Sequence, residues 1–122
     1  MKIFHFVLLL IFALGMGIGQ ILFKVAAQRN AAILEEQGGL QGMLALASDG
    51  FFWIAAILYG VLTIYWVWLL SFLPLSRAYP ATFFSLLFVT AGGVLFLHEP
   101  LNPLLLAGLF FLSLGILLVA LS

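Results

Sequence analysis

The chain has 122 residues, of which 66% are hydrophobic and only 7% are charged, and its mean hydropathy is +1.35. A soluble domain is roughly 45–50% apolar and about 25% charged, and one this small has no interior that could hide so much apolar surface. Four basic residues balance four acidic ones and there are no cysteines, which excludes a nucleic-acid partner, disulfide frameworks and thiolate metal sites. An integral membrane protein remains.

Four apolar stretches are each long enough for a helix that crosses the bilayer, which takes about 20 residues. They cover residues 4–25, 51–71, 75–97 and 101–121. Their apolar residues are continuous and do not alternate, which favours helices over the strands of a membrane barrel. We therefore predict an all-α integral membrane protein in which residues 1–122 form a single domain of four transmembrane helices. The first stretch exceeds the roughly 7–15-residue apolar core of a signal peptide and is interpreted as a span.

The connections differ in length. A long polar loop covers residues 28–49 and is predicted to contain a short interfacial helix over residues 40–47. The other two connections are short and marked by prolines, so the spans that they join form antiparallel hairpins.

Charge does not determine the orientation of the chain in the membrane. Lys2 and Arg77 fall on one side of the membrane, whereas Lys24 and Arg29 fall on the other. The positive-inside rule therefore gives a tie. Either the acidic loop or an insertion partner settles the orientation, or copies of the chain insert in both directions.

Gln20 and Lys24 are the first candidates for a functional site, because polar residues at membrane depth are costly. They lie four residues apart near the end of the first span, on one helix face with Met16. Three glycines in the same region allow a neighbouring backbone or a ligand to approach closely: Gly15, Gly17 and Gly19. In the alternative interpretation, Lys24 extends to the headgroups and Gln20 bonds to a neighbouring helix.

The third span carries further candidates at its two ends. Arg77 stands one turn into the apolar run, near a helix N-terminus that itself favours anions, and a guanidinium binds phosphate or carboxylate with two parallel bonds. Tyr79 adds a hydroxyl beside it, and Pro80 is expected to kink the helix. Glu99, at the other end, either titrates, pairs with a lysine or caps the next helix. The alternative for Arg77 and Tyr79 is an interfacial arginine with a belt tyrosine.

Gly108 and Gly115 are seven residues apart and so share one face of the fourth span. Small residues in register let two helices pack closely, either between chains, which we favour, or within the bundle. Aromatic residues enrich the second span, where they either stack on a substrate or face lipid: Trp53, Tyr59, Tyr65, Trp66 and Trp68. The sequence contains no recognisable catalytic set, metal-ligand cluster or cofactor motif, so we expect no catalytic residues, no metal and no cofactor.

Two motifs resemble a known superfamily. The run Gly19-Gln20-Ile21-Leu22-Phe23-Lys24 and the segment from Pro74 through Tyr79 resemble the small multidrug resistance type of the drug/metabolite transporter (EamA-like) superfamily. The resemblance implies a four-helix bundle that works as a dimer, with Gly108 and Gly115 at the dimer interface and Tyr79 facing the substrate. Cation-exporting members carry a glutamate in the first helix where this sequence has Met16.

The sequence is more similar to the flippase subunits for undecaprenyl-phosphate-linked 4-amino-4-deoxy-arabinose. Those proteins also lack the first-helix glutamate, and they carry motifs like Gly19-Gln20, Ala78-Tyr79-Pro80 and His98-Glu99-Pro100. Arg77 departs from the isoleucine that precedes the Ala-Tyr-Pro motif there.

This resemblance implies a transporter, not an enzyme, in the bacterial inner membrane. Its expected cargo is a polyprenyl-phosphate-linked sugar, such as undecaprenyl-phosphate aminoarabinose. Arg77 and Lys24 are expected to hold the phosphate, Gln20 and Tyr79 to hydrogen-bond the phosphate or the sugar, and Glu99 to complete the substrate-binding set.

The expected partners are membrane lipids and a second subunit, because a chain of this length supplies only one half of a two-fold transporter. That subunit is either another copy, in a homodimer that an antiparallel arrangement would suit, or a related small protein. One alternative function is proton-coupled efflux of small hydrophobic cations or metabolites, with Glu99 as the acid. The other is a membrane subunit that transports nothing.

Overall fold

A computed structural model describes residues 3–122 of the chain, and over these residues it contains helices and loops without strands. Four helical stretches are long and apolar enough to cross a membrane. They are α1 (Ile3–Arg29), α4 (Gly50–Leu70), a third span formed by consecutive segments over Leu75–Phe96, and α7 (Pro103–Leu121). The prediction of an all-α, multi-pass membrane protein with four spans is confirmed. Lys2, which entered the charge count, lies outside the described residues.

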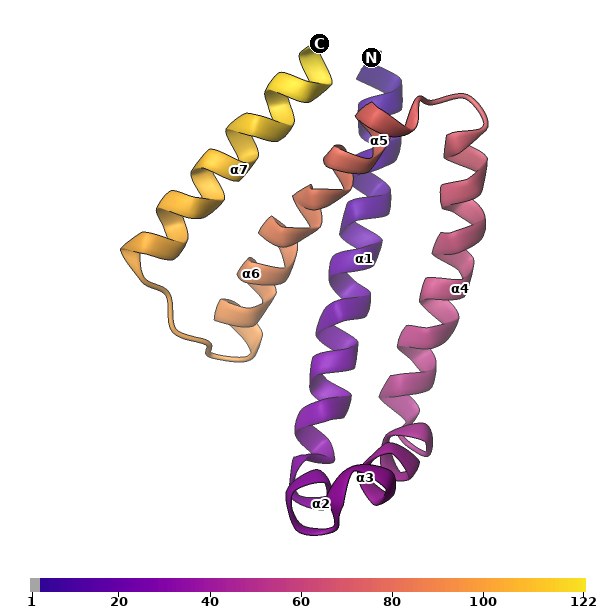
Figure 1. The fold of residues 1–122 in the computed structure, drawn as a ribbon, viewed down its shortest axis with the longest axis vertical. Helices are drawn as coiled ribbons and strands as arrows, with labels where there is room; N and C mark the ends of the chain where they lie inside the picture. The colour runs from indigo at the N-terminus through magenta and orange to yellow at the C-terminus, as the bar shows by residue number, and fades with distance from the viewer. Residues whose placement is uncertain (1–2) are drawn as a thin grey trace.

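α1 is the centre of the bundle. It packs against α4 on one side and against the third span on the other (Figure 1). Two of its glycines allow this packing, because a Cβ at Gly15 would lie 2.9 Å from Leu62 on α4 and a Cβ at Gly17 would lie 2.9 Å from Phe88 on the third span. The larger cluster of buried side chains joins α1 to the other two spans: Leu9, Phe12, Leu69, Leu73, Ala78 and Ala81.

The third span is not one uniform helix. It consists of α5 (Leu75–Ala81), a short 3-10 turn η1 (Thr82–Phe84) and α6 (Ser85–Phe96). Pro80 lies inside the helical run and has no N–H to donate, so the expected irregularity is present. The Thr82 hydroxyl donates to the Tyr79 carbonyl oxygen at 2.6 Å beside this irregularity. As a result α5 contacts α7, while α6 packs along α1.

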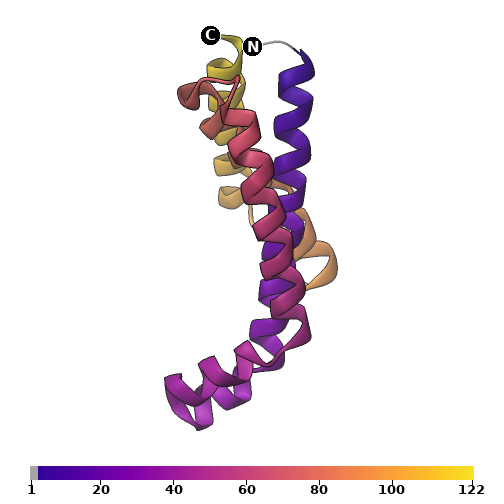
Figure 2. The same cartoon turned by 90° about the vertical axis from the view of Figure 1, so that its right-hand side faces the viewer.

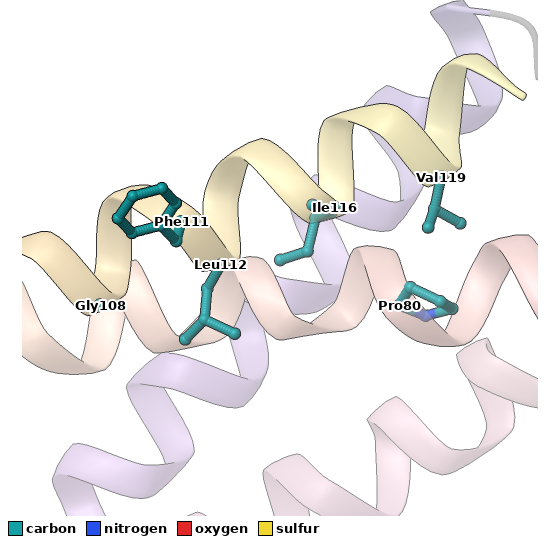
Figure 3. A pocket seen from close by; sticks show the side chains of 7 residues that line it. Pro80, Gly108, Phe111, Leu112, Ile116 and Val119 are labelled. Carbon is teal, nitrogen blue, oxygen red and sulfur yellow. The ribbon is translucent and has the colours of Figure 1, made fainter.

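α7 lies at the edge of the bundle (Figure 1). It begins where the Asn102 side chain accepts the Leu105 N–H at 2.8 Å, and Ile116 is its one buried residue. An open groove of about 430 Å³ separates it from Pro80 (Figure 3). Gly108 and Gly115 line this groove and are exposed, and a Cβ added at either would meet no other atom within 4 Å. They do not mediate close packing within the chain, so the role predicted for them between chains stays a prediction.

The long polar loop is mostly helical. α1 continues to Arg29, and α2 (Ala31–Glu36) and α3 (Gly38–Ala47) follow. The two short helices form a hairpin that leaves the bundle axis where α1 ends and α4 begins (Figure 2). Gly38 has a φ of +85° at the turn between them, a conformation that suits glycine. The helix predicted over residues 40–47 is therefore present and slightly longer.

Asp49 closes this hairpin. One carboxylate oxygen accepts the Phe51 N–H at 2.8 Å and so caps α4. The other accepts from the Asn30 side-chain amide at 3.0 Å and from Arg29 Nε at 3.2 Å, both at the end of α1. Burial raises the pKa of Asp49, but the Asn30 and Phe51 hydrogen bonds and the Arg29 charge hold it below its ordinary value. The network ties the first span to the second.

Acid should weaken this connection. Because the Asp49 pKa is lowered in the folded chain, its contribution to stability is fully present above the ordinary carboxyl pKa of about 3.9 and is lost as the pH falls through the lowered value. We expect Asp49→Asn to lower the thermal unfolding midpoint in detergent at neutral pH. We also expect the midpoint of this variant to fall less than that of the parent protein as the pH is lowered. Glu36→Gln, at an exposed acid in the same loop, is the control. An unchanged acid dependence in Asp49→Asn would contradict this role.

Candidate functional site

Three of the predicted site residues line one small pocket between α1 and the end of α6. Gln20 and Lys24 come from α1, and Glu99 comes from the chain just after α6. The pocket has a volume of about 200 Å³, and its other walls are apolar or glycine: Ile21, Val89, Gly93 and Leu97. A cation, an amide and a carboxylate therefore share one small space between membrane spans.

Glu99 reaches this pocket because the chain reverses at the end of α6. His98 has a φ of 56°, a left-handed conformation that few residues other than glycine adopt. The N–H groups of Leu97 and Glu99 both donate to the Gly93 carbonyl oxygen, at 3.2 and 3.0 Å. A Cβ at Gly93 would lie only 2.9 Å from a carboxylate oxygen of Glu99. The missing side chain at Gly93 thus leaves the space that the Glu99 carboxylate occupies.

Gln20 is held by α4. Its side-chain amide nitrogen donates to the Tyr59 hydroxyl at 2.7 Å, and that hydroxyl donates to the Met16 carbonyl oxygen at 3.1 Å. A Cβ at Gly19 would collide with the Tyr59 ring, so glycine is required for this approach. Phe23 contacts the same ring, with centroids 5.4 Å apart. Gln20 therefore both bonds a neighbouring helix and lines the pocket, which combines the two interpretations of this residue.

Tyr59 has a role that the sequence analysis did not consider. There it was one of the aromatic residues of the second span expected either to stack on a substrate or to face lipid. In the structure its hydroxyl positions a polar side chain of another span. A tyrosine at mid-membrane usually needs a hydrogen-bond partner, and the polar Gln20 within the glycine-rich part of the first span was the available signal.

Arg77 and Tyr79 lie at the other end of the bundle. Arg77 is near the start of α5, which lies beside the C-terminal end of α7 (Figure 1). Its Nη2 donates to the Ser122 carbonyl oxygen at 3.0 Å. Tyr79 is 54% exposed and lines an open apolar pocket of about 680 Å³ with Trp66 and Pro80. The structure therefore divides the five predicted residues between the two ends of the bundle.

This separation corrects one expectation. Arg77 and Lys24 cannot hold one phosphate together within a single chain. The third span has 22 residues, and at about 1.5 Å per residue its two ends are roughly 30 Å apart. Arg77 lies at the first end, and Glu99, whose pocket contains Lys24, follows the second. The physical reason is topological, since one whole span separates Lys24 from the segment that carries Arg77.

The described part of the chain brings no three histidine, cysteine, aspartate or glutamate side chains close enough to hold a metal ion. Its polar pocket offers ionic and hydrogen-bonding groups instead. Lys24 can bind an anion, Glu99 can bind a cation, and Gln20 can do either through its amide. Such a set suits the recognition of a charged headgroup.

The fold and the pocket define a small, multi-pass membrane protein with a polar site between its spans. The chain is similar to a curated protein of Photorhabdus laumondii subsp. laumondii, named "probable 4-amino-4-deoxy-L-arabinose-phosphoundecaprenol flippase subunit ArnE". The two are 38% identical over 68 residues, which are 56% of this chain and 60% of that protein. The match thus spans less than two thirds of the relative, and it supports the resemblance seen in the motifs. No protein-family model matches the chain, and no solved structure does.

The coupling between Tyr59 and Gln20 can be measured. Tyr59→Phe removes the hydroxyl that joins Gln20 to Met16, whereas Tyr65→Phe removes a hydroxyl of the same helix that donates to the Leu8 carbonyl oxygen at 2.9 Å. Hydrogen bonds between membrane helices contribute about 0.6 kcal/mol on average and up to about 1.7 kcal/mol. In double-mutant cycles with Gln20→Ala, we expect Tyr59→Phe to show a coupling free energy in this range and Tyr65→Phe to show none. Equal coupling for the two tyrosines would refute the link.

Proposed function

We propose that this chain is one subunit of a flippase that moves a polyprenyl-phosphate-linked amino sugar across the bacterial inner membrane. The observation that carries the proposal is the pocket of Gln20, Lys24 and Glu99 between apolar spans. The similarity to a protein named as a phosphoundecaprenol flippase subunit supports it. Without that similarity, the pocket would indicate only a ligand with charged groups.

The two charges of the pocket suit a headgroup that also carries two charges. Lys24 would bind the phosphate, and charge-assisted hydrogen bonds of this kind contribute about 1.5–3 kcal/mol each. Glu99 would bind the ammonium group of an amino sugar. Gln20, which Tyr59 holds in place at 2.7 Å, would bond to the phosphate or to a sugar hydroxyl. The polyprenyl chain would remain in the bilayer, against the apolar outer surfaces of the spans.

Arg77 would serve the same substrate at the opposite membrane face. A headgroup that crosses the membrane must be bound where it enters and released where it leaves, so two separated cations are useful to a flippase. Lys24 and Arg77 would then act one after the other. The phosphate would replace the Ser122 carbonyl oxygen, to which Arg77 now donates at 3.0 Å.

The second subunit would complete the passage. An inverted copy, or an inverted related protein, would place an Arg77-type site beside a Lys24-type pocket at each membrane face. Gly108 and Gly115 are exposed on α7 and would form the contact between the subunits. A homodimer and a heterodimer both satisfy this arrangement.

One observation favours the second candidate, which is proton-coupled efflux of a small hydrophobic cation. The Glu99 carboxylate lies in the pocket, where it could exchange a proton for a cation. Against this function, Met16 occupies the position where cation exporters carry their glutamate. The two functions make opposite demands on Lys24, because a nearby ammonium assists phosphate binding and opposes cation binding.

Transport assays in proteoliposomes test the proposal. With a polyprenyl-phosphate amino sugar as substrate, we expect Lys24→Met and Arg77→Ala each to abolish flipping because each removes a phosphate ligand. Lys24→Arg should retain part of the activity, since it keeps the charge. Each variant should show the unfolding midpoint of the parent protein. Flipping that survives in both Lys24→Met and Arg77→Ala would overturn the proposal and leave the chain as a subunit without a transport site.

Glu99→Gln separates the two candidate functions. For the flippase, this substitution should slow the amino-sugar lipid and spare a neutral-sugar lipid, because only the former carries an ammonium group. For a cation exporter, it should abolish pH-dependent cation uptake while Lys24→Met leaves that uptake intact.

Native mass spectrometry on gently extracted protein identifies the bound lipid directly. A bound polyprenyl-phosphate species would support the flippase, and bulk phospholipid alone would support cation efflux.

A further inference from the structure

α3 carries an apolar stripe that the described part of the chain does not cover. Leu40, Met43 and Leu44 are 73%, 67% and 56% exposed. With Ala47 they follow the spacing i, i+3, i+4 and i+7, which places all four on one face of a helix. Three large apolar side chains side by side on so short a helix need an apolar environment.

The stripe points away from α2 because the opposite face of α3 packs against α2. At 100° per residue, Gly42 lies on the side of the helix away from Met43 and Leu44 taken together. Gly42 is buried against Leu34 of α2, so closely that a Cβ there would collide with it. The stripe therefore points away from α2 and cannot turn inward without breaking the hairpin.

The position of α3 indicates what covers the stripe. The hairpin leaves the bundle axis where α1 ends and α4 begins (Figure 2). The hydrogen bonds of Asp49 to Arg29, Asn30 and Phe51 hold the two ends of the hairpin together at this position. The indole N–H of Trp53 donates to the Ala47 carbonyl oxygen at 2.6 Å, and Trp53 is itself 53% exposed, as a tryptophan at a membrane–water interface is. Ile54, 56% exposed, continues an apolar outer surface along α4.

We propose that the α2–α3 hairpin is an interfacial foot that lies on the bilayer, with the stripe of Leu40, Met43 and Leu44 inserted among the lipids. The occupant of this face is the bilayer itself, because the stripe is continuous through Trp53 with the outer surface of a membrane span. The exposed acids of α2, Glu35 and Glu36, lie in the water or headgroup layer. This inference does not depend on any transport activity.

The foot would set the depth of the polar pocket. Lys24 lies five residues before Arg29, the last residue of α1 before the foot, and that is about 7–8 Å along the helix. The hydrocarbon core is about 30 Å thick and the bilayer with its interfaces about 40–45 Å, so each interface is roughly 5–8 Å thick. A foot resting in the interface therefore places Lys24 near the boundary between headgroups and hydrocarbon.

Spin-label accessibility tests the foot. The chain has no cysteine, so single-cysteine variants of the full chain carry one label each. The labels go on Met43→Cys and Leu44→Cys in the stripe and on Glu36→Cys as the matched control in the same hairpin. The protein is reconstituted in phosphatidylcholine vesicles, and collision with oxygen, which concentrates in lipid, is compared with collision with a water-soluble nickel chelate.

We expect the two stripe labels to collide mainly with oxygen and the Glu36→Cys label to collide mainly with nickel. Stripe labels that collide mainly with nickel would show the stripe in water and overturn the proposal. Stripe labels protected from both reagents would show a protein partner in place of lipid and also overturn it. Circular dichroism of each labelled variant checks that the helices are intact, and Leu40→Cys provides a third stripe position if either variant misfolds.

Discussion

The polar chemistry of this protein depends on how closely α4 approaches α1. Lipid offers no hydrogen bonds, so every polar group inside a span must find a partner within the protein. The Tyr59 hydroxyl provides one for Gln20 and also donates to the Met16 carbonyl oxygen. Both bonds require the tyrosine ring to lie over Gly19, where any side chain would collide with it. A single glycine thus permits a polar residue to face a pocket between apolar helices.

On the opposite wall of the pocket, formed by the end of α6, a glycine again makes room for a polar side chain. Gly93 leaves space above the last turn of α6, and the left-handed turn at His98 brings the Glu99 carboxylate into that space. Lys24 and Glu99 thereby come to one pocket from distant parts of the sequence. Their opposite charges limit the net charge that the membrane must accommodate, and they leave the pocket able to bind either sign.

The sequence predicts the spans better than the site, and the reason differs from residue to residue. The spans follow from composition, because a run of about 20 apolar residues has few other stable forms. The common face of Gln20 and Lys24 follows from helical spacing.

The position of Glu99 in the same pocket does not follow from the sequence, because it depends on a positive φ at His98 and on the packing of α6 against α1. The separation of Arg77 from Lys24 was deducible, since those residues had already been placed on opposite sides of the membrane. The Asn30–Asp49 bond was not deducible, because the two residues are joined by a hairpin whose geometry depends on its own packing.

The edge position of α7 bears on how complete a single chain is. Ile116 is its one buried residue, its main contacts are with α5 and η1, and its two glycines line an open groove. In a bilayer, apolar surface alone does not hold helices together, since lipid is equally apolar, and close backbone approach supplies much of the attraction. Within the described chain that approach is present along α1, at Gly15, Gly17 and Gly19, and is absent at Gly108 and Gly115. The bundle is therefore firmly packed around α1 and loosely packed at α7, and a second subunit seated on α7 would supply there the kind of contact that α1 already has.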